Sequence, residues 1–488
     1  MAQIDNIKQS RLDKLESIKK SGLNPFPSKS RKNHCINQIL DDFSKLSKSK
    51  KKVILAGRIM SIRGHGEVTF LDVRDGTGKI QAFLSKDKVK EKKYNFFLEN
   101  FDIGDIIELD GILFQTKRGE KTIEVSKFNI LTKSLLPMPE KWHGLQDYED
   151  RYRKRYLDLL LNEELREIFI KKSKFWQVTR DFMNKNGFFE VDTPTLEVTT
   201  GGAEANPFKT HHDDFDINLY LRISVGELWQ KRLIAAGFEK TFEIGKIYRN
   251  EGSSADHLQE FTNMEFYWAY ADYEDGMGLV KKLFREIASK VFGTTKFKSK
   301  NFEFDLSKEW KKISYREEIL SQTKIDVLKA SEEEIKAKLK ELNVKYEGEN
   351  ISRLIDSLWK YCRKNIAGPV FLIDHPKTVS PLAKEKIDNP GITERFQVII
   401  AGTELGNGYS ELNNPIDQRE RFEEQQKLLK AGDKEAMMPD WDFIEMLEHG
   451  MPPTCGFGFG ERLFSILIDK PMRETTLFPL IKPETLTN

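Results

Sequence analysis

The sequence predicts an α+β chain in two parts, a small β-barrel followed by a larger antiparallel sheet flanked by helices. Between residues 53 and 131, short runs rich in β-branched and aromatic residues alternate with glycine-containing turns. After residue 151, longer helical segments alternate with strands, and strands that short loops join pair antiparallel. At 488 residues the chain is too long for one core of ordinary size, so two domains are expected.

Charge, cysteine content and hydropathy exclude several classes of protein. Lys and Arg (79) nearly balance Asp and Glu (77), so any contact with nucleic acid must come from local patches. The three cysteines are far apart and lack histidines at metal-binding spacing, which argues against a disulfide framework and a zinc site. No stretch approaches 18 apolar residues, and the N-terminus lacks the core of a signal peptide. We expect a cytoplasmic protein without membrane association.

The first predicted domain, residues 1–140, combines an N-terminal helix with an OB-type barrel. Apolar residues recur at near-helical spacing up to about Lys20 and predict the helix. The lysines among them are better explained by a solvated helix face than by a contact with RNA. Five strand-like runs follow, separated by turns such as DGTG and KRGE. They read VILAGRIM, VTFLDV, KIQAFL, DIIELDGILF and TIEVSKF.

The second predicted domain covers residues 141–488. The proline-containing stretch LLPMPEKWHGLQ places the boundary near residue 140. Helices and strands then alternate to the end of the chain. A charged helical insertion is expected at about residues 311–368, and we identify no chemistry in it.

Polar residues alternate along the segment IYRNEGSSADHLQEFTNMEFYWAY. In a strand, residues i and i+2 share a face, so Arg249 would lie with Glu251, and Glu265 with Tyr267. An arginine beside the ring of Phe261 suits a nucleotide, the guanidinium for phosphate and the ring for the base. A solvent-exposed sheet face with cross-strand ion pairs remains the alternative.

Two later segments favour a binding site. In AGTELGNGYSELNNP, polar side chains bracket two glycines on a predicted strand. In PPTCGFGFGERLFSILI, a glycine-rich run leads into an apolar helix. Backbone can approach a ligand closely at glycine, and a helix N-terminus favours anions, although glycines also mark tight turns. The run lacks the GK[ST] of a phosphate-binding loop.

Three segments resemble the ordered motifs of the class II aminoacyl-tRNA synthetases: FFEVDTPTL, IYRNEGSSADHLQEFTNMEFYWAY and GFGFGERL. With HGLQDYEDRYRKRYLDLL, TTGGAEANPFKTHH and ELGNGYSELN added, the chain resembles bacterial-type class II lysyl-tRNA synthetases from about Lys51 to Pro483. The resemblance implies activation of L-lysine with ATP and Mg²⁺ to lysyl-adenylate, followed by transfer to the 3′ end of tRNA(Lys). It also implies a homodimer, with the motif around Pro194 at the subunit interface.

The resemblance implies roles for particular residues. Arg249 and Arg462 would be catalytic and would clamp the ATP phosphates. Other family positions give ATP-binding residues Glu251, His257, Phe261 and Glu404, with Glu404 also the metal ligand; lysine-binding residues Gly202, Glu227, Glu265, Tyr267, Asn407, Tyr409 and Glu411; and anticodon-reading residues Phe70, Gln81 and Glu120. In the lysine set, Glu227 would bind the α-amino group, and Glu265, Tyr267 and Glu411 the ε-amino group.

The chain departs from the family pattern in places. A metal-binding glutamate of the family aligns with Gln397, and one residue is missing between Gly460 and Arg462. An extra residue precedes Glu227. Alternatives to a lysyl-tRNA synthetase are an aspartyl- or asparaginyl-tRNA synthetase, a non-catalytic RNA-binding protein and a protein-lysylating paralogue.

Overall fold

The computed structural model describes residues 2–139, 147–203, 205–346, 351–432 and 436–484. The chain divides into two compact units, Met1–Arg151 and Tyr152–Asn488. The boundary predicted near residue 140 lies among residues 140–146, outside the described residues. Within the described ranges, no helix is both long enough and apolar enough to cross a bilayer.

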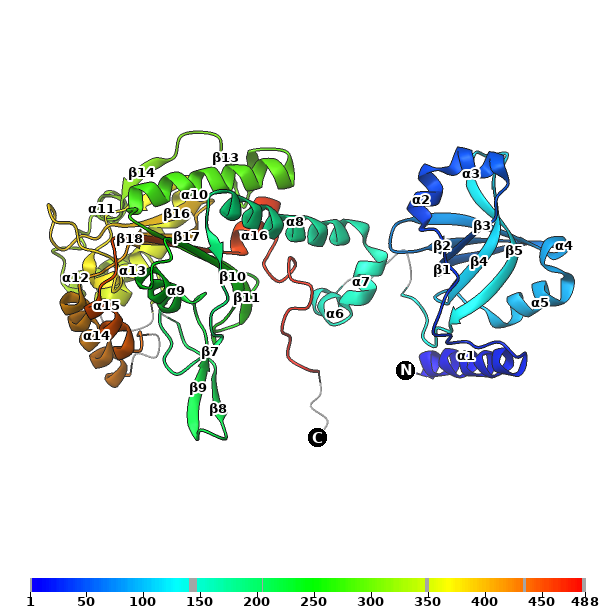
Figure 1. Cartoon of the computed structure of the whole chain (residues 1–488), viewed down its shortest axis with the longest axis horizontal. Helices are drawn as coiled ribbons and strands as arrows, with labels where there is room; N and C mark the ends of the chain where they lie inside the picture. Colours follow the sequence, from blue (N-terminus) through cyan, green and yellow to red (C-terminus); the bar gives the residue numbers. More distant parts are fainter. Residues whose placement is uncertain (1, 140–146, 204, 347–350, 433–435, 485–488) are drawn as a thin grey trace. The chain divides into compact units, whose positions relative to one another are not determined.

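The N-terminal unit contains a closed five-stranded barrel (Figure 1). Its strands follow the order β1-β2-β3-β5-β4, as expected for the predicted OB-type fold. Two glycines allow the strands to approach closely, because a Cβ on Gly57 or Gly111 would lie 2.7 or 2.1 Å from a backbone oxygen of the facing strand. The strands are β1 (Val53–His65), β2 (Val68–Arg74), β3 (Lys79–Ser85), β4 (Ile106–Gln115) and β5 (Lys121–Thr132).

Helices cover this barrel. The predicted N-terminal helix is α1 (Ala2–Lys20), and Leu15 and Ile18 on it are buried. The guanidinium of Arg11 donates hydrogen bonds to the carbonyls of Ile103, Ser134 and Leu136, which ties α1 to the unit. The remaining helices are α2 (Ile36–Asp41), α3 (Phe43–Ser49), α4 (Lys86–Val89) and α5 (Glu91–Asn100).

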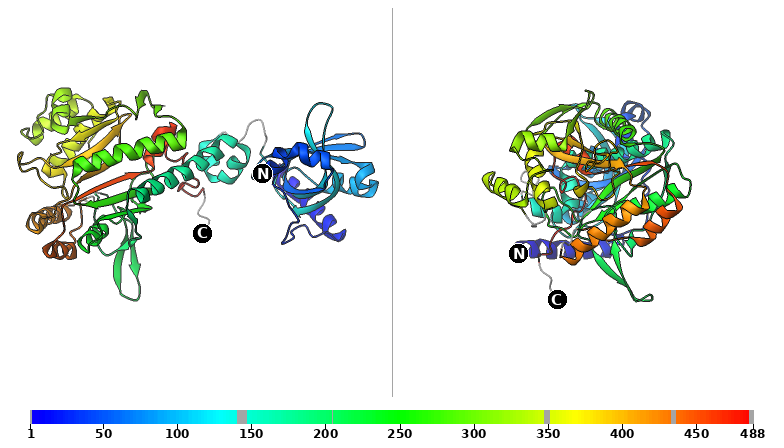
Figure 2. Two further views of the ribbon diagram at one scale, coloured as in Figure 1. Left: turned by 45° about the horizontal axis from the view of Figure 1, so that its top comes forward. Right: turned by 90° about the vertical axis from the view of Figure 1, so that its left-hand side faces the viewer.

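An eight-stranded sheet forms the C-terminal unit (Figures 1 and 2). Most neighbours pair antiparallel, as predicted, but β14 with β15 and β10 with β6 pair parallel at the two edges, so the sheet is mixed. In order across the sheet the strands are β14 (Lys311–Ser314), β15 (Val370–Ile373), β16 (Arg395–Ile400), β17 (Thr403–Ser410), β18 (Thr454–Gly460), β11 (Glu260–Ala269), β10 (Lys240–Tyr248) and β6 (Phe189–Glu190).

The two faces of this sheet differ. On one face, Phe266, Phe396 and Phe457 pack in a core with helices α8 (Glu163–Lys185), α10 (Tyr273–Ile287) and α16 (Arg462–Ile468). On the other face, Tyr267 and Tyr409 pack towards helices α9 (Glu227–Ala235), α14 (Pro415–Lys430) and α15 (Trp441–His449). Alternation along the strands therefore gives one apolar face and one face that carries polar side chains.

The smaller elements complete the unit. The other helices are α6 (Tyr148–Arg153), α7 (Arg155–Leu161), α11 (Tyr315–Thr323), α12 (Glu332–Glu341), α13 (Ile351–Cys362), and short helical turns at Ala288–Phe292, Arg363–Asn365 and Lys377–Val379. The other strands are β7 (Leu196–Glu197), β8 (Lys209–His212), β9 (Ile217–Leu221), β12 (Lys296–Ser299) and β13 (Phe302–Asp305).

Two details of the sequence prediction are wrong. Strand β10 ends at Tyr248, so Arg249 and Glu251 lie in the following loop rather than on a strand face. The insertion near residues 311–368 is helical in α11, α12 and α13, but it begins with the sheet strand β14. Side chains of α13 also line a cavity beside the site described next, so the insertion contributes to that region.

Candidate active site

A cavity of about 330 Å³ opens on the polar face of the sheet. Its walls come from β11, β16, β17 and β18, from the start of α9, and from the loops around Gly202 and Ser380. All seven residues predicted to bind lysine line it, together with Arg249 and Glu404: they are Gly202, Glu227, Glu265, Tyr267, Asn407, Tyr409 and Glu411. The fold therefore brings together residues that are more than 200 positions apart in the chain.

Three buried carboxylates and two phenols give this cavity an acidic end. Glu265 accepts hydrogen bonds from the backbone N–H of Val225 (2.8 Å) and the hydroxyl of Tyr267 (3.2 Å). Burial raises the pKa of Glu265 to about 7, and the charge of Glu227 adds to this shift. Tyr409 donates its hydroxyl hydrogen bond to Glu227. Such an end favours a cationic ligand.

One ammonium group already lies among these carboxylates. The Nζ atom of Lys231, on α9, is 2.7 Å from Glu227 and 2.5 Å from Glu411, and its side chain is 2% exposed. Lys231 was not among the site residues predicted from the sequence. The spacing from Glu227 to Lys231 is that of an ion pair on a helix, but such pairs are usually solvated, so spacing alone gave no sign of burial.

Glycines of β18 make room for the acidic side chains. A Cβ on Gly456 would lie 2.1 Å from an oxygen of Glu411, and one on Gly458 would lie 2.7 Å from Cγ of Glu265. The glycine-rich run thus permits close approach, as predicted, but here the approaching atoms belong to the pocket side chains. The helix that follows this run, α16, has 7 residues, and we assign no anion site to its N-terminus.

A cationic region adjoins the acidic end. The guanidinium of Arg249 lies over the ring of Phe261, with 5.5 Å between them. Burial lowers the pKa of Arg462, and the charges of Arg249 and Arg363 lower it further, while Glu404 acts in the opposite direction. Arg363 is 3.5 Å from Glu404 and was not singled out in the sequence. Several arginines in one place suit a polyphosphate.

Other residues predicted to bind ATP lie in the loop between β10 and β11. Nδ1 of His257 is 2.7 Å from the hydroxyl of Ser254, and burial lowers the pKa of His257, with the charge of Arg462 adding to the shift. The charge of Glu251 opposes this shift in the pKa of His257. Neither they nor Phe261 and Arg462 line the larger cavity. Phe261 on β11 contacts Arg249, which does line the cavity, and Arg462 at the start of α16 donates a hydrogen bond to the carbonyl of Asp256 in the loop.

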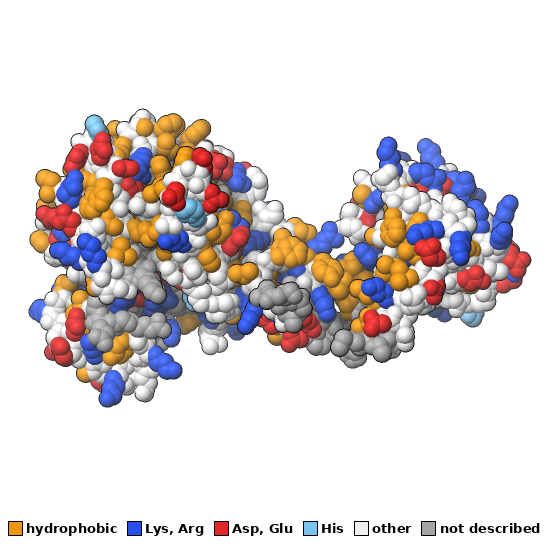
Figure 3. Space-filling model, turned by 90° about the horizontal axis from the view of Figure 1, so that it is seen from below, with side chains coloured by type: hydrophobic (Ala, Val, Ile, Leu, Met, Phe, Trp, Pro, Cys, Tyr) orange, Lys and Arg blue, Asp and Glu red, His pale blue; other side chains and the backbone are white. Residues whose placement is uncertain are grey.

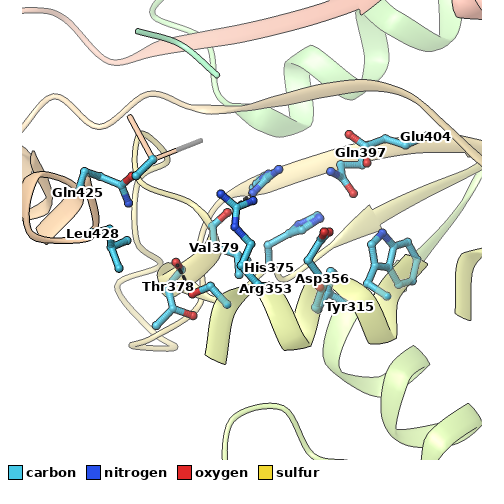
Figure 4. Close-up of a pocket in the computed structure, with 14 residues that line it drawn as sticks. Tyr315, Arg353, Asp356, His375, Thr378, Val379, Gln397, Glu404, Gln425 and Leu428 are labelled. Atoms are coloured by element: carbon cyan, nitrogen blue, oxygen red, sulfur yellow. Dashed lines mark hydrogen bonds between the residues drawn. The ribbon is translucent and has the colours of Figure 1, made fainter. Parts of the chain in front are cut away.

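A smaller cavity of about 110 Å³ adjoins the first between α13 and β16 (Figure 4). Gln397 and Glu404 line both cavities. The buried ring of His375 lies against Gln397, yet neither its nitrogens nor Oε1 of Gln397 makes a hydrogen bond of normal geometry. Burial and the charge of Arg395 lower the pKa of His375 well below its usual range, so the ring is neutral.

The donor set around Glu404 is compatible with Mg²⁺. Among the described residues, no group of three or more His, Cys, Asp or Glu side chains could hold a metal. One carboxylate, from Glu404, and one unsatisfied amide oxygen, from Gln397, nevertheless line the same cavity. Mg²⁺ commonly takes one or two protein oxygens and completes its shell with water and substrate phosphates, so these two residues fit it.

The predicted anticodon residues lie on the barrel. Phe70 of β2 is half-buried, and its ring centroid is 5.3 Å from that of Phe83, its partner on β3. Gln81 also lies on β3, two residues from Phe83, and accepts a hydrogen bond from Thr122 (3.0 Å). Glu120 is exposed in the turn before β5. Phe70 and Gln81 therefore share one face of the barrel.

Comparison with known proteins agrees with this architecture. Residues 147–482 match the family described as tRNA synthetases class II (D, K and N), and residues 53–131 match an OB-fold nucleic acid binding domain. The larger unit is thus the catalytic part of a class II tRNA synthetase.

Full-length relatives define the family more closely. A protein named lysine–tRNA ligase from Thermosipho africanus is 44% identical over 486 residues, which are 98% of this chain and 97% of the relative. The protein of that name from Thermotoga maritima is 43% identical, with 99% and 97% covered, and that from a Roseiflexus species is 41% identical, with 99% of each covered. The chain belongs to the family of the class II lysine–tRNA ligases.

Proposed function

We propose that this protein is a lysine–tRNA ligase that activates L-lysine with ATP and transfers it to the 3′ end of tRNA(Lys). The observation that carries the proposal is the cavity itself, which is lined by buried carboxylates and by Arg249, with Arg462 beside it. Lysine presents two ammonium groups to the acidic end, and ATP presents phosphates to the arginines. A charging assay with lysine, ATP and bulk tRNA tests the proposal, since accumulation of lysyl-tRNA is expected and its absence contradicts it.

The first step joins two bound substrates without a protein nucleophile. The lysine carboxylate attacks the α-phosphorus of ATP, a P–O bond to the β-phosphate breaks, and lysyl-adenylate and pyrophosphate form. Arg249 and Arg462 stabilise the charge that develops on the phosphate oxygens, and Phe261 stacks on the adenine. Positioning and charge stabilisation therefore supply the catalysis.

In the second step, the 3′-terminal ribose hydroxyl of the tRNA attacks the carbonyl carbon of lysyl-adenylate. The ester bond to the tRNA forms, and AMP leaves with the electrons of the broken bond. The residues around Gly202, Asn407 and Tyr409 would hold the aminoacyl group during this transfer. The hydroxyl of Tyr409 donates a hydrogen bond to Glu227 and so holds in place the carboxylate proposed to bind the α-amino group of lysine.

We propose Mg²⁺ as the metal that accompanies ATP. Glu404 and Gln397 would hold it, and when bound it would neutralise charge on the phosphates. Because an amide replaces a carboxylate at Gln397, this chain would depend more strongly on the phosphates of ATP as further ligands.

The barrel is proposed to bind the anticodon. OB barrels bind single-stranded nucleic acid on aromatic side chains, and Phe70, Phe83 and Phe114 form such a group with centroid distances of 5.3 and 5.8 Å. In Figure 3, Lys and Arg side chains gather along one edge of this unit. A tRNA ligase needs this module, whereas a protein-lysylating enzyme does not.

Replacing Phe70 with alanine should weaken tRNA binding by about 1 to 3 kcal/mol, the usual effect of a lost base stack, and leave lysine activation intact. Binding of tRNA(Lys) by fluorescence and pyrophosphate exchange measure the two effects. Leu98→Ala, at an exposed apolar side chain of the same unit, is the control. Equal loss in both assays, or in neither, would remove Phe70 from the anticodon site.

The KM for lysine should fall as pH rises from about 6 to 8. Glu265 has a pKa of about 7, and it accepts an ammonium group only when ionised, so protonation below that pH competes with lysine. Each pH unit below the pKa should raise KM by up to about tenfold. Pyrophosphate exchange at several pH values gives the profile, and Glu265→Gln should flatten it. A flat profile in the wild type would contradict this role.

We also propose a homodimer in the cytoplasm. Exposed apolar side chains gather around the first family motif, on β6, β7, β9 and nearby loops, as expected of a subunit interface. They include Phe189 (59% exposed), Leu196 (49%) and Val198 (64%).

The alternatives differ in the chemistry of the pocket. Aspartate or asparagine would meet buried carboxylates, which disfavour a substrate with an anionic or neutral side chain. A non-catalytic RNA-binding protein would not need Arg249, Arg462 and Glu404 beside one another.

A further inference from the structure

Lys231 is the one ammonium group that faces the pocket carboxylates among the described residues. Its Nζ lies between Glu227 (2.7 Å) and Glu411 (2.5 Å). The aromatic rings of Tyr267, Tyr409 and Phe443 surround it at 5.5 to 5.8 Å. A lysine that is 2% exposed is costly to bury unless its charge is matched, so these contacts define a built ion-pair site.

The balance of charge at the acidic end of the pocket favours a role for Lys231 in lysine recognition. Glu227, Glu265 and Glu411 supply three carboxylates, and Lys231 supplies one ammonium. With these four groups ionised, the acidic end of the cavity carries an excess of two negative charges, and a lysine substrate brings two ammonium groups. Among the described residues, Glu265 accepts hydrogen bonds from neutral donors, the Val225 N–H and the Tyr267 hydroxyl.

We propose that Lys231 is a positioning residue for lysine recognition, whose ammonium favours the ionised form of Glu411 and fixes both Glu227 and Glu411 in place, so that the free pocket is already arranged to accept ammonium groups. The inference rests on the proposed function and adds a residue to it. Lys231 does not touch the substrate in this scheme. It acts through the two carboxylates.

The electrostatics of the surrounding groups agree. Burial raises the pKa of Glu411 well above its usual range, and the charge of Lys231 opposes this shift, whereas Glu227 and Glu265 add to it. Burial alone would lower the pKa of Lys231, but Glu227 and Glu411 outweigh it and the pKa is raised. The other groups that face this cluster are the phenols of Tyr267 and Tyr409 and the thiol of Cys455, all with pKa values well above usual, so they remain neutral.

Lys231→Met separates this role from a purely structural one. Without the ammonium, Glu411 ionises only at higher pH, so the KM for lysine should rise at pH 7. The fall of this KM with rising pH should also continue to a higher pH than in the wild type. The ratio of variant to wild-type KM should then fall by up to about tenfold per pH unit between pH 7 and 9. The KM for ATP should stay near the wild-type value.

A double variant supplies the matched control. In Lys231→Met with Glu411→Gln, the carboxylate that Lys231 ionises is absent, so the extended pH dependence should disappear. At pH 9, where Glu411 of Lys231→Met would be ionised without its partner, the double variant should also unfold at a higher temperature than Lys231→Met alone, because no uncompensated carboxylate remains at position 411. This thermal comparison remains decisive if the single variant is too unstable for kinetics.

The outcomes are distinct. The proposal is overturned if the KM for lysine depends on pH in Lys231→Met as it does in the wild type. It is also overturned if the double variant with Glu411→Gln shows the same displacement of this pH dependence as Lys231→Met. A double variant no more stable than the single one overturns it as well. If the wild type fails to activate lysine at all, the proposed function fails instead, and the thermal comparison still reports on the pairing of Lys231 with Glu411.

Discussion

Replacing Arg462 with alanine should lower the rate of lysyl-adenylate formation by about 10²- to 10³-fold, the usual effect of removing one group that stabilises transition-state charge. Arg462 is a partly buried arginine that Arg249, Arg363 and Glu404 influence electrostatically. The KM for lysine should change little, because the acidic end of the pocket is unaltered. Pyrophosphate exchange at saturating lysine and varied ATP measures the effect.

Arg419→Ala is the matched control for this variant. Arg419 forms a solvent-exposed ion pair with Glu448 on α15, outside the pocket, so its loss should leave exchange unchanged. Arg462→Lys should recover part of the lost rate, since it keeps the charge but loses the planar guanidinium. A rate for Arg462→Ala within about threefold of wild type, well below the usual effect, would remove Arg462 from the nucleotide site.

Replacing Glu411 with glutamine should raise the KM for lysine about thirtyfold or more. The substitution keeps the shape and removes a buried charge, and truncating one partner of a buried charge pair costs about 2 to 5 kcal/mol. Norleucine lacks the ε-ammonium, so its disadvantage relative to lysine should shrink in the variant. Exchange with both amino acids gives the discrimination ratio.

The result for Glu411 must be separated from damage to the nucleotide site. The KM for ATP should stay near the wild-type value, and Glu448→Gln, at an exposed position, should behave as wild type. If the ratio of exchange with lysine to exchange with norleucine is unchanged in a folded variant, Glu411 pairs only with Lys231 and does not bind the substrate. Recognition of the ε-ammonium would then rest on Glu265 and Tyr267.

Local patterns in the sequence were sufficient for much of the fold. Alternating apolar residues and glycine turns identified the barrel strands, and the period of two placed Glu265 and Tyr267 on one face, where they now share a hydrogen bond. The hairpin of β10 and β11 was expected too, and Phe242 pairs with Phe266 in it. The predicted domain boundary near residue 140 remains a prediction.

Features that depend on distant partners could not be read in this way. Lys231 looks like an ordinary surface lysine until Glu411, 180 positions away, is placed against it. Arg363 lies near the end of the charged helical insertion, and only the fold brings it to Glu404. Arg249 lies one residue past the end of β10 at Tyr248, although its backbone N–H still donates to the carbonyl of Gln259 (2.9 Å), and residue type alone does not mark such an end.

The acidic cavity is proposed to select lysine for activation by ATP. Pyrophosphate exchange with purified protein, ATP and Mg²⁺, and with lysine, aspartate or asparagine added singly, tests it most directly. Exchange is expected with lysine and not above background with the other two. Exchange with aspartate or asparagine but not with lysine, or with no amino acid at all, would contradict the account.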